Sequence, residues 1–119
     1  MKRLFIGSTL LLLTVLFACS KSSSTTNSTT TPSPADCSAT ISFSATVSPI
    51  ISASCAIAGC HASGSSNGPG ALTTYAQISA AKGSISSAVA NGSMPKGSSL
   101  TASQKQAIVC WVSQGGANN

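Results

Sequence analysis

Acidic side chains are almost absent from this 119-residue chain, in which Asp36 is the only aspartate or glutamate. Hydrolysis by paired carboxylates requires two such groups, and a Ser-His-Asp triad requires one to orient its histidine. A nucleophilic Cys-His pair oriented by an amide, from Asn67 or Gln77, is possible, but no motif supports it. We therefore expect that the protein is not an enzyme.

Arginine is missing beyond Arg3, and the four lysines that follow are scattered over the rest of the chain. Proteins that bind nucleic acid gather their cations into a stripe or patch, because neutralisation of phosphates supplies much of the affinity. This chain has no basic run of that kind. We therefore expect no nucleic-acid partner.

Large aromatic residues are also few, with 3 Phe, 1 Trp and 1 Tyr, whereas cysteine is frequent, with 5. The first third of the chain lacks the pattern of a globular domain, so the folded part should be roughly 80 residues long. A domain of that size buries little apolar surface and is commonly stabilised by a disulfide, a metal or a cofactor.

The chain begins "MKRLFIGSTLLLLTVLFACS", with two basic residues, an apolar run and a small residue directly before Cys19. This is the pattern of a secretory signal, and the run is shorter than the roughly 20 residues that span a bilayer. "LFAC" resembles the bacterial lipoprotein processing site, which implies a signal peptide over residues 1–18 and acylation of Cys19. An ordinary signal peptide with an incidental cysteine is the alternative. We expect an exported lipoprotein of the periplasm or cell envelope, held on a membrane by its lipid anchor.

Residues 19–36 form a stretch of mainly Ser, Thr, Asn and Pro with almost nothing apolar to bury. Such a composition cannot offset the entropy of ordering and predicts a disordered tether. A tether of this kind has an r.m.s. reach of about 20 Å, which lets a small domain swing above its anchor. The remaining residues, 37–119, are the predicted folded domain.

Beyond the tether, apolar residues return with helical spacing. After a start that is extended, Val47, Ile50 and Ile51 lie around Pro49 on the apolar face of a first helix that ends near Ser54. The segment "SGSSNGPGA" that follows is predicted to be a loop.

Two short helices are expected next. "TTYAQISAAKG" predicts a helix that is capped by Thr73 or Thr74 and ended by Gly83. Gln77 is available there for a capping box. "SISSAVANG" then predicts a separate helix that ends at Gly92.

The clearest helical pattern is "TASQKQAIVCWVSQGG". Thr101 and Gln104 predict a capping box at its start, and the Gly-Gly pair predicts its end. Its apolar stripe comprises Ala107, Ile108, Trp111 and Val112. No segment convincingly predicts a strand, so we expect an all-α domain of three to four short helices.

The only histidine, His61, follows Cys60 directly, and Cys55 lies a few residues upstream in "CAIAGCH". This arrangement attaches c-type haem, because two thiols add across the vinyl groups and the adjacent imidazole becomes the proximal iron ligand. The usual spacing has two residues between the cysteines, whereas this chain has four. These residues are small except for Ile57, so a wider loop is sterically easy. We expect one covalently bound haem c.

An iron that only transfers electrons usually has a second protein ligand. Met94 is the only methionine left once the signal is removed, and it lies in a Met-Pro turn with polar neighbours. A thioether ligand there would raise the reduction potential relative to a bis-histidine site. We expect Met94 as the distal ligand. The alternatives are a core-filling role for Met94 and a sixth position that is open or bound by lysine.

Three segments taken together, "ATVSPIISASCAIAGCH", "GALTTYAQI" and "SMPKGSSLTASQKQAIVCWVSQGGANN", resemble the small monohaem c-type cytochrome domains found in lipoproteins of Bacteroidetes-like bacteria. The resemblance spans roughly residues 43–118 and includes the haem attachment site, the Met-Pro loop and the terminal helix. It implies the cytochrome c-like fold, in which the first and last helices cross and the haem lies in the cleft. It also implies one-electron transfer with redox partner proteins.

Two cysteines remain, Cys37 before the first helix and Cys110 within the last. Counting alone does not decide the pairing, because four cysteines can pair in three ways. If the two helices cross as the resemblance implies, these thiols can meet. We therefore predict a Cys37–Cys110 disulfide, which would contribute about 4 kcal/mol because the loop it closes is long.

Three other hypotheses account for fewer of these features. A disulfide-stapled lipoprotein domain with a structural or adhesive role would have Cys55 paired elsewhere and His61 on the surface. A haem enzyme such as a peroxidase would need distal acid-base groups, which the sequence hardly offers. A structural zinc site would need a distant thiol as its fourth ligand. The sequence therefore favours a membrane-tethered electron carrier.

Overall fold

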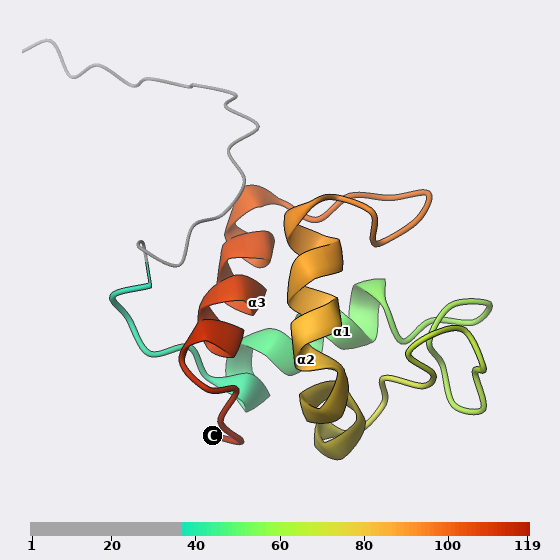
Figure 1. Ribbon diagram of the computed structural model, residues 1–119, viewed down its shortest axis with the longest axis horizontal. Coiled ribbons are helices and arrows are strands. Elements are labelled where there is room, and N and C mark those ends of the chain that lie inside the picture. The colour runs from blue at the N-terminus through green and yellow to red at the C-terminus, as the bar shows by residue number, and fades with distance from the viewer. Residues whose placement is uncertain (1–36) are drawn as a thin grey trace, which may run out of the picture.

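Helices make up all of the regular secondary structure in residues 37–119, the part of the chain that the computed structural model describes (Figure 1). A π-helical turn, η2 (Phe43–Val47), leads directly into α1 (Ser48–Ser54). Two longer helices follow, α2 (Tyr75–Ala90) and α3 (Ala102–Ser113). No strand occurs among the described residues, so the prediction of an all-α domain is confirmed.

The predicted signal peptide (1–18), the lipidated Cys19 and the tether (19–36) lie outside the described residues. Within residues 37–119, no helix combines the length and apolar character needed to cross a membrane. The structure therefore describes the predicted folded domain and no other part of the chain.

The first helix begins earlier than the sequence predicts, at Phe43, whereas residues 37–42 before it form no helix and the backbone of Ser42 is extended as expected. Ser42 caps it, and its hydroxyl accepts a hydrogen bond from the backbone N–H three residues further on, at 3.2 Å. Phe43, Val47 and Ile51 are all buried and share one face at a spacing of four residues. η2 and α1 therefore form one continuous helical segment with a common apolar face. Its predicted end at Ser54 is confirmed.

The prediction of two short helices on either side of Gly83 is wrong, because α2 runs through this glycine without interruption. Ile78, Ile85 and Val89 are buried at spacings of seven and four residues, so a single apolar face continues past the glycine. Burial of this face outweighs the cost of a glycine inside a helix, which is about 1 kcal/mol.

Both long helices begin with the predicted capping boxes. The Thr74 hydroxyl accepts the N–H of Gln77 at 3.3 Å, and the Gln77 side-chain oxygen accepts the N–H of Thr74 at 3.1 Å. Thr101 and Gln104 form the same pair at the start of α3, at 3.2 and 2.9 Å. These bonds satisfy N–H groups that the helices leave without partners, and they fix where each loop enters its helix.

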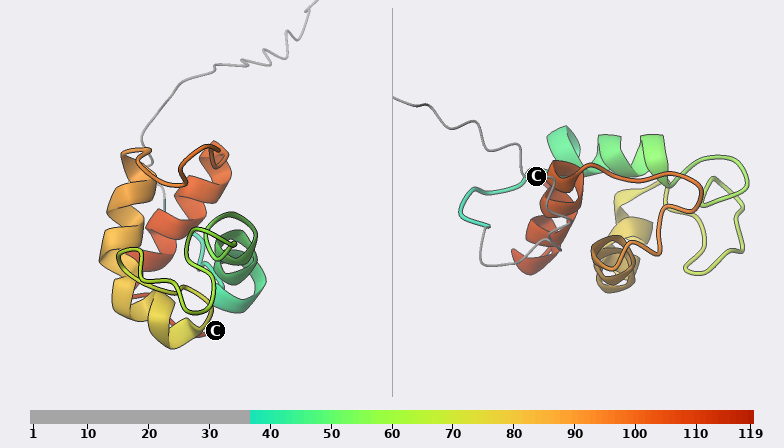
Figure 2. Two further views of the ribbon diagram at one scale, coloured as in Figure 1. Left: turned by 90° about the vertical axis from the view of Figure 1, so that its right-hand side faces the viewer. Right: turned by 90° about the horizontal axis from the view of Figure 1, so that it is seen from above.

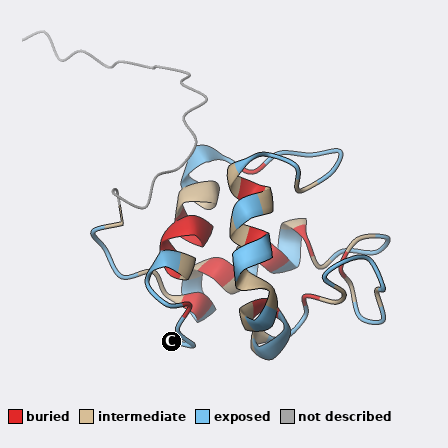
Figure 3. Ribbon diagram, in the orientation of Figure 1, coloured by how far each residue is buried: buried red, intermediate tan, exposed pale blue. Residues whose placement is uncertain are grey.

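The core lies where α3 packs beside α2 and across η2 (Figure 1). The ring centroid of Phe43 lies 5.0 Å from that of Tyr75, edge to face, and 5.5 Å from that of Trp111. Trp111 is only 1% exposed, and the rest of the predicted α3 stripe is buried except for Val112, which is half-buried. In Figure 3, buried segments alternate with exposed and intermediate ones along the helices.

The segment after α3 folds back over this aromatic cluster. The predicted Gly-Gly stop is confirmed, with φ of +98° at Gly115 and +72° at Gly116. The indole N–H of Trp111 donates to the carbonyl of Ala117 at 2.8 Å, and the Tyr75 hydroxyl donates to the carbonyl of Gly116 at 2.9 Å. The polar atoms of both aromatic side chains are therefore satisfied.

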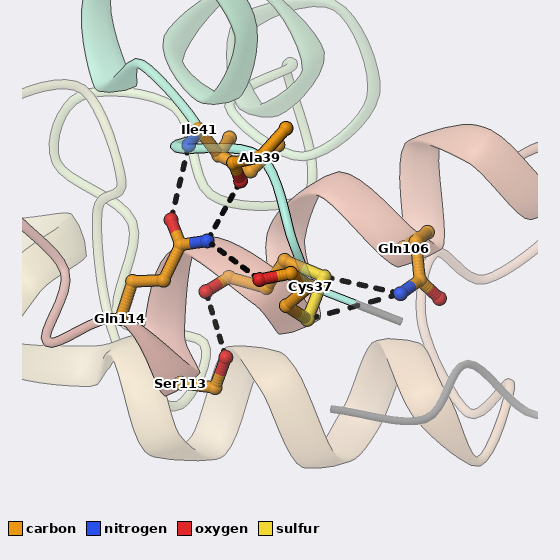
Figure 4. The surroundings of a disulfide bond; sticks show 7 residues. Cys37, Ala39, Ile41, Gln106, Ser113 and Gln114 are labelled. Atoms are coloured by element: carbon orange, nitrogen blue, oxygen red, sulfur yellow. Dashed lines mark hydrogen bonds between the residues drawn. A yellow bond between two sulfur atoms is a disulfide. The ribbon is translucent and has the colours of Figure 1, made fainter. Parts of the chain in front are cut away.

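The predicted disulfide between Cys37 and Cys110 is confirmed, with a Cα–Cα distance of 5.1 Å (Figure 4). It joins the start of the described chain to the middle of α3. The side chain of Gln114 holds the segment that follows Cys37. Its amide NH₂ donates to the carbonyl of Ala39 at 2.8 Å, and its oxygen accepts the N–H of Ile41 at 3.0 Å. Residues 37–42 are thus fastened to α3 although they form no helix or strand.

Candidate cofactor-binding site

A cavity of about 490 Å³ lies at the opposite end of the domain from the disulfide. One wall is the face of α2, and the others come from two loops, residues 55–72 and 91–101. Both loops lie on the side that faces the viewer in the left panel of Figure 2. The apolar wall includes Leu72, Ile85 and Val89. Its size and apolar lining are those of small-molecule and cofactor sites.

The loop after α1 brings three of the predicted site residues to this cavity. Cys55 ends the helix, and its N–H donates to the carbonyl of Ile51 at 2.8 Å. The chain then closes on itself, because the N–H of His61 donates to the carbonyl of Cys55 at 3.0 Å. Cys55, Cys60 and His61 all line the cavity, and both cysteines are free thiols. The loop between the two cysteines reaches the surface, where the side chain of Ile57 is 44% exposed.

His61 is buried and its ring is held in one orientation. Its Nδ1 lies 2.8 Å from the carbonyl oxygen of Gly70, and because a carbonyl only accepts, Nδ1 carries the proton. Within residues 37–119, Nε2 has no hydrogen-bond partner, and no fully buried side-chain nitrogen or oxygen there lacks one. Nε2 therefore borders the open cavity with its lone pair available, which is the tautomer that a metal ligand requires.

Met94 reaches the same cavity from the loop after α2. The N–H of Met94 and the hydroxyl of Ser93 both donate to the carbonyl of Ala88, at 3.2 and 3.3 Å. These bonds fold the loop back onto the last turn of α2. The side chain of Met94 is half-buried, and Lys96 also lines the cavity, so the structure leaves both the thioether and the lysine alternatives for a distal ligand.

Burial raises the pKa of the Cys55 thiol above its ordinary value, and repulsion from Cys60 adds to the effect. The protonated thiol is thus the favoured form of Cys55. This shift is the opposite of the one that activates a cysteine nucleophile. The site therefore lacks the electrostatic preparation that a Cys-His hydrolase or transferase needs at Cys55.

Asn67 is a site residue whose role the sequence did not predict. Its amide Nδ2 donates to the carbonyls of Gly59 and Cys60, at 3.1 and 3.0 Å. The hydroxyl of Ser65 also donates to the carbonyl of Cys60. These bonds brace the backbone directly before His61. The run "NGPG" predicted a loop but gave no sign that the loop folds back on the cysteines.

The disulfide-stapled alternative required a surface histidine and a paired Cys55, and the structure has neither, since His61 is buried and Cys55 is free. Within residues 37–119, no three His, Cys, Asp or Glu side chains gather as a cage for a metal ion. A haem iron is held by its porphyrin and needs only axial protein ligands, so the haem hypothesis does not require such a cage.

Comparisons with protein-family models, with curated proteins and with solved structures give no significant match to this chain.

Proposed function

We propose that this protein is a membrane-tethered monohaem c-type cytochrome that carries one electron at a time between redox partner proteins. The observation that supports it most strongly is the convergence on one cavity of Cys55, Cys60, His61 and Met94. These residues come from two loops separated by a whole helix. Their types are those that covalent haem attachment and axial ligation require.

The residues present fit the group. Cys55 and Cys60 would hold a haem through two thioether bonds, each formed when an S–H adds across a vinyl C=C, with the proton going to the second vinyl carbon. This addition requires free thiols, and both Cys55 and Cys60 are free. His61 would be the proximal ligand through Nε2, because Nδ1 is committed to Gly70.

The haem would supply an iron that alternates between two oxidation states, and the chain supplies its surroundings. Leu72, Ile85 and Val89 present an apolar wall, which would limit the access of water to the haem. The bond of His61 to the carbonyl of Gly70 and the bonds of Asn67 hold the imidazole and the cysteine loop in place. A preorganised site of this kind would keep reorganisation small when the charge of the iron changes.

We also propose that the all-α fold is cytochrome c-like. It is supported by the packing of α3 across η2 and by the position of the cavity between the loops that follow α1 and α2. We also propose that Cys19 carries the lipid anchor and that residues 19–36 act as the tether, which places the domain in the cell envelope.

Replacing Met94 by alanine tests the distal ligand. Removal of a thioether ligand should lower the reduction potential and alter the optical spectrum of the iron. An unchanged spectrum in the Met94→Ala variant would remove Met94 from the site and leave the lysine-bound or open alternatives.

The proposal as a whole is tested by producing the full chain in a host with cytochrome c maturation and staining the denatured protein for haem. Only covalent haem survives denaturation, so the wild type should stain and a Cys55→Ser, Cys60→Ser double variant should not. The matched control is the Cys37→Ser, Cys110→Ser variant, which also lacks two cysteines but keeps the cavity. An unstained wild-type protein would refute the proposal.

A further inference from the structure

Among the described residues, Lys96 is the only charged side chain that lines the cavity, and it directly follows Pro95. It follows Met94 by two residues, on the loop that hydrogen bonds tie to the end of α2. Its side chain is exposed, and within residues 37–119 it has no hydrogen-bond or ion-pair partner. The ammonium group of Lys96 therefore has all of its donors available for a group bound in the cavity.

The rest of the described chain offers Lys96 no acidic partner, because residues 37–119 contain no aspartate or glutamate. The other two lysines of the domain are placed differently. Lys82 donates to the carbonyl of Gly115 at 2.8 Å, and neither Lys82 nor Lys105 lines the cavity. Of the three lysines in residues 37–119, Lys96 is therefore the one that can meet an anionic group bound in the cavity.

We infer that Lys96 pairs with a carboxylate of the bound cofactor, an inference that rests on the proposed haem function. Haem carries two ionised propionate groups, which must lie where polar atoms or solvent can reach them, whereas the deeper wall of the cavity is apolar. The pair joins the Met94 loop to the cofactor. It also places a positive charge near the carboxylate, which lowers the electrostatic cost of adding an electron to the iron.

The test is the reduction potential of the matured, full-length protein and of three variants. Lys96→Gln should shift the potential downward, and Lys96→Arg, which keeps the charge, should restore the wild-type value. Lys105→Gln removes a lysine that does not line the cavity and should shift the potential less than Lys96→Gln does. Because the pair is exposed, the difference between wild type and Lys96→Gln should shrink as salt is added.

The optical spectrum separates this role from iron ligation. If Lys96 pairs with a carboxylate, the spectrum of Lys96→Gln stays that of the wild type while the potential shifts. A potential equal to that of the wild type overturns the inference. A changed spectrum that arginine fails to restore also overturns it, because lysine would then be the ligand. A wild-type protein without covalent haem refutes the proposed function itself, which is a distinct result.

Discussion

The two ends of this small domain differ in how their side chains are packed and hydrogen-bonded. At the closed end, the aromatic cluster of Phe43, Tyr75 and Trp111 is covered by the returning C-terminal segment and stapled by the disulfide. At the open end, the loops 55–72 and 91–101 surround a cavity with two free thiols and an imidazole nitrogen that has no hydrogen-bond partner among the described residues.

This difference indicates how each end contributes to the stability of the domain. The apolar residues of both ends belong to one core, and within residues 37–119 no fully buried side-chain nitrogen or oxygen lacks a partner. At the closed end this core is covered by aromatic side chains and the C-terminal segment, whereas at the open end Leu72, Ile85 and Val89 also line the cavity. Under the proposed function, a bound haem would cover these three side chains and add to the core, as cofactors commonly do in small domains.

The largest expected effect is at the closed end, in a Trp111→Ala variant. Trp111 is 1% exposed and its N–H bonds Ala117, so its removal leaves a large cavity and an orphaned carbonyl. The free energy of unfolding should fall by about 5 kcal/mol, measured by urea denaturation. Val112→Ala, on the same helix but half-buried, is the control and should cost much less. Equal losses would show that the aromatic cluster is not the principal core.

Loss of the disulfide should rank next. The Cys37→Ala, Cys110→Ala variant releases a link between residues 73 positions apart, which should lower the free energy of unfolding by about 4 kcal/mol. Reduction of the wild type should produce a similar loss in the same urea titration. A variant as stable as the wild type would mean that Gln114 and the core already hold residues 37–42 in place.

Two isoleucines of α2 allow a direct comparison of the two ends of the domain. Ile85 lines the cavity, whereas Ile78 is buried away from it. In haem-free protein, Ile85→Ala should cost about 2 kcal/mol, and in the matured protein about 4, because a bound haem would add contacts to a side chain that lines the cavity. Ile78→Ala should cost the same in both forms. If the cost at Ile85 does not depend on the haem, the cavity is not where the cofactor binds.

The smallest expected effect is a gain. Gly83 is helical, and a Cβ there would meet nothing within 4 Å, so Gly83→Ala should stabilise the protein by about 0.5 to 1 kcal/mol. Gly115→Ala is the control, since φ is +98° at that position and the substitution should destabilise. A destabilising Gly83→Ala would indicate that α2 needs flexibility between its two halves.

The sequence predicted those features that depend on nearby residues. The capping boxes at Thr74 and Thr101 and the Gly-Gly end of α3 follow from rules that act within one helical turn, and the structure has all three. The disulfide required a long-range hypothesis about crossing helices, and the pairing of Cys37 with Cys110 is present.

Features that depend on tertiary packing were missed. Gly83 is a helix terminator by local rules, but the buried face of α2 extends past it and decides the outcome. The early start of the first helix likewise depends on the packing of Phe43 against Trp111. The bracing of the cysteine loop by Asn67 joins residues whose proximity no periodicity in the sequence reveals.

The most direct test of the central claim is the intact mass of the matured protein after denaturation and reduction, with peptide mapping. The account predicts a mass greater than that of the lipidated chain by one haem. The added mass should map to the tryptic peptide between Lys21 and Lys82, which contains Cys55 and Cys60. A colourless protein whose mass is explained by amino acids and lipid alone would contradict the account.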